Sequence, residues 1–153
     1  MSGGHIDIFA LNLEVPGQAP VALLSTPASE ESPRPSPDGR WLAYATNASG
    51  TMQTRIASLT DARTVVQITE ESGDPIGWSS TGARLFYRDA AAIWSVDVSD
   101  SGPLLATRRV AFRLPRDLVG TPAVRPGGQQ AILIRGGAIY SDLVVRQGVL
   151  TGR

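Results

Sequence analysis

The sequence predicts an all-β protein made of short strands and tight turns. Among its 153 residues are 16 glycines and 11 prolines, and 42% of the residues are hydrophobic. This composition, with its short β-branched runs, favours many strands joined by turns over long helices. A turn-and-strand motif also recurs along the chain. Because a chain of this length can bury a sizeable core, we expect one structural unit.

The clearest copy of the motif is the turn formed by Ser36, Pro37, Asp38 and Gly39. Proline fixes φ, aspartate can accept a hydrogen bond from the backbone ahead of it, and glycine tolerates a positive φ. The apolar run that follows, residues 41–46, is expected to be a strand with both faces at least partly buried. The pattern therefore predicts a tight turn that opens a buried strand.

Two weaker copies of this turn follow along the chain. Ser79 and Gly82 take the places of the serine and the glycine in the second copy, and Pro126 and Gly128 take those of the proline and the glycine in the third. A period of about 40–45 residues with four short strands is typical of a β-propeller blade, because stacked sheets bury faces that no single sheet could bury. Two unrelated hairpins of a β-sandwich are the alternative.

The repeat predicts a single propeller segment over residues 1–153 with about three to three and a half four-stranded antiparallel blades. Too few blades are present to close a ring, and an open arc exposes edge strands that favour association. We expect a fragment of a longer protein or a ring completed by a second copy. The predicted units are a half blade at 6–26, blades at 31–69 and 74–112, and a partial blade at 120–151.

Residues 36–44, Ser-Pro-Asp-Gly-Arg-Trp-Leu-Ala-Tyr, resemble the WD40-like repeat of TolB-type bacterial β-propellers. Residues 79–87 and 125–128 resemble two further, more divergent blades, so the similarity covers most of residues 6–140. It implies a propeller with a central channel that takes part in protein–protein contacts. Similar propellers are attached to bacterial protein kinases and winged-helix regulators, and others cover the active site of prolyl-oligopeptidase-like hydrolases.

Charge and composition narrow the classes of partner. The chain has 14 basic residues, every one an arginine, and 14 acidic ones, so its formal net charge is +0 and no nucleic-acid partner is predicted. The arginines gathered around Phe112 are expected to form a solvated strand edge; they are Arg108, Arg109, Arg113 and Arg116. No signal peptide or membrane span is predicted, and the compartment stays undecided.

Candidate catalytic motifs are better explained as structure. Residues 77–82 come close to the Gly-x-Ser-x-Gly motif of serine hydrolases but carry Thr81 before the final glycine. The single histidine, His5, lies in a glycine-rich N-terminal segment, so a histidine-dependent triad is not expected. The adjacent pairs Glu30-Glu31 and Glu70-Glu71 are predicted to be solvated loops between blades.

No metal or cofactor site is predicted either. The chain has one histidine and no cysteine, which leaves few zinc ligands and no disulfide framework. The aspartates that calcium could use have no calcium-loop spacing and fit turns and strand ends better. These aspartates are Asp38, Asp61, Asp74, Asp89 and Asp97.

The sequence therefore predicts a non-catalytic module that binds a protein partner. The motif residues are predicted to be structural turn markers: Ser36, Pro37, Asp38, Gly39, Ser79, Gly82, Pro126 and Gly128. Two alternatives stay open. The chain could be a segment of the propeller domain of a prolyl-oligopeptidase-like hydrolase, or a ligand-sensing propeller attached to a kinase or a winged-helix regulator.

Overall fold

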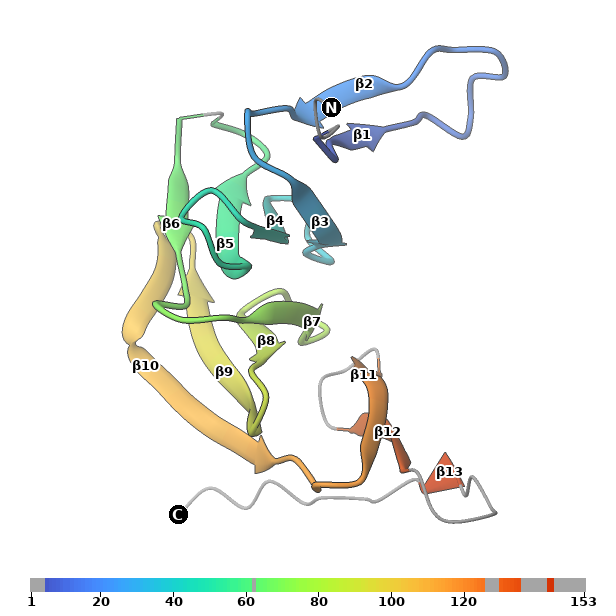
Figure 1. Ribbon diagram of the computed structural model, residues 1–153. Coiled ribbons are helices and arrows are strands. Elements are labelled where there is room, and N and C mark those ends of the chain that lie inside the picture. The colour runs from blue at the N-terminus through green and yellow to red at the C-terminus, as the bar shows by residue number, and fades with distance from the viewer. Residues whose placement is uncertain (1–4, 62, 126–129, 136–142, 145–153) are drawn as a thin grey trace.

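The computed structural model describes residues 5–61, 63–125, 130–135 and 143–144. All regular structure in these residues is β, arranged in four antiparallel sheets that follow one another along an arc (Figure 1). No sheet closes on the first one, so the structure is a partial β-propeller, as the sequence predicts.

The strands fall into the sheets in chain order. The N-terminal hairpin consists of β1 (Ile8–Ala10) and β2 (Val21–Leu24). The first four-stranded sheet consists of β3 (Glu30–Pro35), β4 (Trp41–Thr46), β5 (Gln53–Ser58) and β6 (Val65–Gln67). The second consists of β7 (Asp74–Trp78), β8 (Arg84–Arg88), β9 (Ala92–Ser99) and β10 (Gly102–Arg113). The C-terminal sheet consists of β11 (Leu118–Val124), β12 (Ala131–Arg135) and β13 (Leu143–Val144).

Each four-stranded sheet is a meander in which neighbours in sequence are neighbours in space. The edge strands β3, β7 and β11 therefore lie along one side of the arc, and β6 and β10 lie along the other (Figure 1). The hairpin pairs Ala10 with Val21 and Phe9 with Ala22, which confirms the two antiparallel strands predicted there.

Strand β4 shows why the sheets stack. All six of its residues are buried, and side chains alternate between the two faces of a strand. Leu42 and Tyr44 pack with Ile8 of the N-terminal hairpin, whereas Trp41 and Ala43 pack towards the second four-stranded sheet. The prediction that both faces of this strand are buried is confirmed.

The second four-stranded sheet is also covered on both faces. Leu85 and Val96 belong to the cluster shared with the first sheet, while Ile76 and Phe86 pack with Leu133 of the C-terminal sheet. Burying an aliphatic or aromatic side chain of this kind contributes about 1.5–3 kcal/mol. The indole Nε1 of Trp78 adds a hydrogen bond of 2.8 Å to the Arg34 carbonyl, which joins β7 to β3.

The prediction of a solvated loop at Glu30 and Glu31 is wrong, because both residues lie in β3. Glu30 begins β3, is 2% exposed, donates its backbone N–H to the Ile6 carbonyl and accepts a hydrogen bond from the Thr26 hydroxyl. Pro33 and Pro35 make this segment look unlike a strand in the sequence. The strand tolerates both prolines because it lies at the edge of its sheet. Glu70 and Glu71 are exposed in a loop, as expected. The predicted markers Pro126 and Gly128 lie outside the described residues.

Candidate functional site

The first turn of the repeat is held by bonds between its own residues. Two hydrogen bonds join Ser36 and Trp41. Ser36 N donates to the Trp41 carbonyl at 2.8 Å, and Trp41 N donates to Ser36 Oγ at 3.0 Å. Gly39 has a φ of 71°, a conformation that favours glycine, and donates its N–H to the Ser36 carbonyl. The Ser36 hydroxyl also donates to the Asp38 carboxylate.

The second turn repeats the hydrogen bonds of the first, although Ser80 and Thr81 replace Pro37 and Asp38. Ser79 N donates to the Arg84 carbonyl at 2.9 Å, Arg84 N donates to Ser79 Oγ at 3.1 Å, and Gly82 has a φ of 74°. Thr81 stands where Asp38 stands in the first turn. The Ser79 hydroxyl therefore holds the start of the next strand, as the Ser36 hydroxyl does in the first turn. His5 is exposed in the N-terminal segment.

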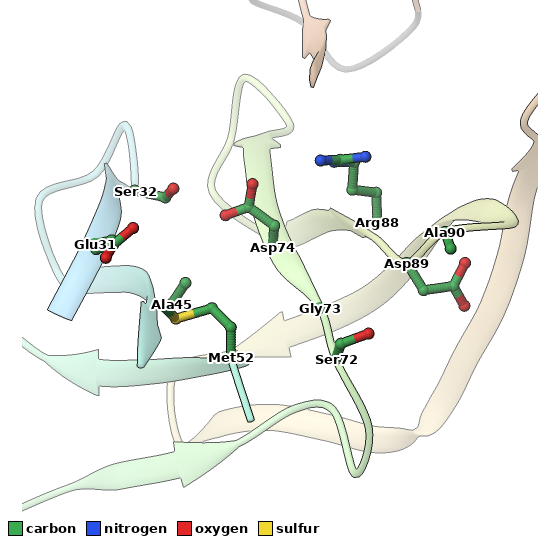
Figure 2. Close-up of a pocket in the computed structure, with 10 residues that line it drawn as sticks. All are labelled: Glu31, Ser32, Ala45, Met52, Ser72, Gly73, Asp74, Arg88, Asp89 and Ala90. Atoms are coloured by element: carbon green, nitrogen blue, oxygen red, sulfur yellow. The ribbon is translucent and has the colours of Figure 1, made fainter. Parts of the chain in front are cut away.

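Two cavities lie at the other ends of these strands. A cavity of about 360 Å³ lies between the first and second four-stranded sheets, where β3 and β7 begin and β4 and β8 end. In Figure 2, Glu31 and Ser32 lie on one side and Arg88 on the other, with the Asp74 carboxylate pointing into the space between them. The remaining lining residues are Ala45, Met52, Ser72, Gly73, Asp89 and Ala90.

A second cavity of about 510 Å³ shares Ser72 and Asp89 with the first. We call the two together the inter-sheet cleft. One wall of the second cavity is aromatic, since Tyr87 and Trp94 stack with ring centroids 6.5 Å apart and an interplanar angle of 9°. Its other lining residues are Thr69, Glu70, Glu71, Leu105, Ala106 and Arg108.

Two polar atoms of the cleft are left without partners. Asp74 Oδ1 and Arg88 Nε are buried and have no hydrogen-bond partner in the described part of the chain. Asp74 and Arg88 lie opposite each other in the pairing of β7 with β8, yet no ion pair joins them. Buried polar groups are nearly always hydrogen-bonded to protein, water or a ligand, and these two atoms have no protein partner among the described residues.

The Asp89 carboxylate, in contrast, accepts hydrogen bonds from three groups of the protein. It accepts hydrogen bonds of 2.7 Å from the backbone N–H groups of Ala91 and Ala92 and from Trp94 Nε1. Burial acts to raise the pKa of Asp89, but these hydrogen bonds outweigh it and hold the pKa below its ordinary value. Burial raises the pKa of the Tyr87 phenol, so this ring stays neutral. Asp89 therefore fixes the Trp94 ring in the wall of the cleft.

The carboxylates outnumber the cations of the cleft. The cleft is lined by two cations, Arg88 and Arg108, and by five carboxylates: Glu31, Glu70, Glu71, Asp74 and Asp89. Arg108 donates to the Ile68 carbonyl at 2.9 Å and lies 3.4 Å from Glu70. Arg88 Nη2 donates to Thr121 Oγ1 at 3.5 Å, which leaves Arg88 Nε without a partner in the described part of the chain. The cleft is therefore a net acidic site.

The aspartates considered for calcium are not brought together. No group of three or more potential metal ligands occurs among residues 5–61, 63–125, 130–135 and 143–144. Asp38 pairs with Arg40, Asp97 with Arg84 and Arg109, and Asp61 accepts from its own turn. Asp74 differs from these aspartates in its unpartnered oxygen.

The arginines around Phe112 do not form one basic surface. Arg108 bonds at the cleft, Arg109 lies 3.3 Å from Asp97, and Arg113 and Arg116 are exposed. In the part of the chain that the structure describes, no helix is long and apolar enough to cross a membrane.

The sequence alone points to part of this site. It marks Glu31, Asp74 and Asp89 as acidic residues of interest, but it places them in turns and solvated loops. It gives no sign of Arg88, which reads as an ordinary strand end. The only signal that could have found the cleft is the recurrence of a charged residue at corresponding strand ends of successive blades.

Solved structures with this arrangement of sheets include a protein assigned as TolB from Agrobacterium tumefaciens and two oligogalacturonate lyases. The TolB structure is 15% identical with a TM-score of 0.64, and the match covers 92% of this chain and 50% of that one. The lyase from Vibrio parahaemolyticus is 17% identical with a TM-score of 0.58, covering 84% of this chain and 36% of that one. A lyase in complex with manganese is 24% identical with a TM-score of 0.50, covering 66% and 27%.

This chain thus spans 50% or less of the length of these three structures. No protein-family model and no curated protein matches the sequence. At these identities the likeness concerns the fold, and it agrees with the stacked four-stranded meanders and the recurring turns described above. The chain has the fold of a partial TolB-like β-propeller.

Proposed function

We propose that this chain is a protein-interaction module that binds its partner in the inter-sheet cleft. The observation that carries the proposal is the pair of unpartnered buried atoms, Asp74 Oδ1 and Arg88 Nε, at the open ends of β7 and β8. Buried polar groups without partners cost free energy, which a bound partner can offset by hydrogen-bonding them. The TolB-like fold supports this role.

The same chain is one propeller segment with the units 6–26, 31–69, 74–112 and 120–151. The observed sheets support this division, because β3 to β6 and β7 to β10 each form a complete four-stranded meander. The residues of the two turns act as structural markers of the repeat. The partner-binding cleft lies between the second and third of these units.

An enzymatic role has less support from the described residues. The hydroxyls of Ser36 and Ser79 are bonded to backbone N–H groups, and the exposed His5 lies outside the cleft lining. Because two of the similar structures are oligogalacturonate lyases, the test is an assay of purified chain for oligogalacturonate cleavage. We expect no turnover, and turnover that Asp74→Asn abolishes would overturn the non-catalytic role.

Copies of the chain also associate through exposed strand edges. The N-terminal hairpin has two strands where the neighbouring sheet has four, and Phe9, Leu13 and Val21 are 54%, 87% and 59% exposed on it. Unpaired edges with apolar side chains promote association. Light scattering should show a mass that rises with protein concentration, and a clean monomer at all concentrations would contradict this.

An unbiased peptide library tests the binding role. Random peptides displayed on phage are selected on wild-type protein, on Ser72→Trp, which fills the junction of the two cavities, and on Ser101→Trp, which changes the exposed β9–β10 turn. We expect enrichment on the wild type and on Ser101→Trp but not on Ser72→Trp. No enrichment, or equal enrichment on all of them, would overturn the proposed function.

A further inference from the structure

We propose that the inter-sheet cleft binds an extended, arginine-bearing segment of the partner protein, an inference that rests on the binding function proposed above. The observations that carry it are the net charge of the cleft, the opposite hydrogen-bonding needs of its two unpartnered atoms and the aromatic wall of its second cavity.

The charge of the lining selects a cation. The lining has five carboxylates and two arginines, and Arg108 is already held by Glu70 and the Ile68 carbonyl. Salt screens the partly buried charges of Glu31, Asp74 and Asp89 less than those of exposed Glu70 and Glu71, so the net charge of the cleft attracts a positive side chain. The same carboxylates repel the phosphates of a nucleic acid.

The two unpartnered atoms require different groups. Asp74 Oδ1 is an acceptor and Arg88 Nε is a donor; both atoms are buried, and both residues line the same cavity. A simple cation can satisfy the aspartate but has nothing to offer the arginine. An extended peptide offers both, because its basic side chain can donate to Asp74 while a backbone carbonyl accepts from Arg88.

The second cavity favours arginine over lysine. Trp94 and Tyr87 form a stacked pair in its wall, and the hydrogen bond from Trp94 Nε1 to Asp89 fixes the indole. A planar guanidinium stacks on an aromatic face and bonds a carboxylate with two parallel N–H groups, whereas an ammonium is a strongly hydrated point charge. Glu71 lines the same cavity and forms no ion pair with another described residue.

The test uses a blocked heptapeptide with two arginines among glycines and serines. Its matched control carries citrulline, which keeps the shape of arginine but not its charge. Titrations of the whole chain are followed by the NMR shifts of the backbone amides at 72–74 and 88–91 and of the Trp94 indole. We expect saturable shifts with the arginine peptide and at least about tenfold weaker binding of the citrulline peptide, the factor that corresponds to losing one ion pair.

Protein variants assign the effect to the cleft. Asp74→Asn and Glu31→Gln should each weaken the arginine peptide about tenfold or more, the factor expected when one partner of a close charge pair is removed. Glu14→Gln removes the same charge from the exposed β1–β2 loop and should leave binding unchanged. Retained dispersion of the amide spectrum shows that each variant is folded.

Several results would overturn the inference while leaving the binding function intact. They are equal binding of the arginine and citrulline peptides, equal weakening by Asp74→Asn and Glu14→Gln, and selection from the phage library of cleft-dependent peptides without basic residues. Binding of free arginine amide as tightly as the peptide would overturn the requirement for an extended segment. Failure of the library to give any cleft-dependent peptide would instead count against the proposed function itself.

Discussion

The two ends of the same strands are built differently. At one end, the Ser36 and Ser79 hydroxyls accept hydrogen bonds from backbone N–H groups of their own turns and Ser36 also donates to Asp38, while the indole Nε1 of Trp41 is buried there without a partner among the described residues. At the other end, Asp74 and Arg88 keep buried atoms without partners beside an open cavity. The comparison indicates that the hydroxyls of the recurring motif support the fold, and that the unpartnered groups that line the inter-sheet cleft lie away from it.

The largest effects should come from breaking the turns at their glycines. Gly39→Val and Gly82→Val force a β-branched residue into a positive φ, at a cost of about 1–3 kcal/mol. A Cβ at Gly82 would also lie 3.0 Å from the Asp38 carboxylate, whereas one at Gly39 meets nothing within 4 Å. In urea unfolding, Gly82→Val should therefore have a lower free energy of unfolding than Gly39→Val. Unchanged midpoints in both would show that neither turn is as described.

Removing the turn hydroxyls should have the next largest effect. Ser36→Ala leaves the N–H of buried Trp41 without its side-chain acceptor, and Ser79→Ala does the same for the less buried Arg84. Leaving a buried donor unsatisfied costs about 1–3 kcal/mol, so Ser36→Ala should cost more than Ser79→Ala. The peptide affinity of both variants should stay at the wild-type value, since the turns lie at the far ends of the strands. A larger loss of stability for Ser79→Ala would contradict the account of the turns.

The first turn should also show a pH dependence that the second lacks. The hydrogen bond from Ser36, followed by those from Arg40, holds the pKa of Asp38 below its ordinary 3.8. Its stabilising contribution is thus present above that value and is lost as the pH falls through the folded-state pKa. Asp38→Asn should make the loss of stability in acid shallower, and the matched Glu14→Gln should follow the wild type. An identical acid profile for Asp38→Asn would exclude this contribution.

The smallest effect on stability is expected in the cleft. Asp74→Asn removes a partly buried charge that has no ion-pair partner among the described residues, so the free energy of unfolding should stay within about 0.5 kcal/mol or rise slightly. Urea unfolding of this variant checks the contrast with Ser36→Ala. A destabilisation as large as that of Ser36→Ala would mean that Asp74 supports the fold and not a ligand.

The sequence predicts the fold well because its determinants are local. The alternation of Trp41 to Thr46 and the turn at Ser36 to Gly39 depend on residues that are close in the chain. It predicts the edge strand β3 poorly, since Pro33 and Pro35 are compatible with a strand only at a sheet edge, which is a tertiary property. The cleft depends on residues of several strands meeting between two sheets, and no local pattern encodes that meeting.

Hydrogen exchange with and without the arginine heptapeptide tests the central contrast between the two ends of the strands most directly. Binding in the cleft should slow exchange at residues 69–74 and 88–94 and leave the turns at 36–41 and 79–84 unchanged. Slower exchange at the turns with no change in the cleft would contradict the account, as would protection that persists in Asp74→Asn.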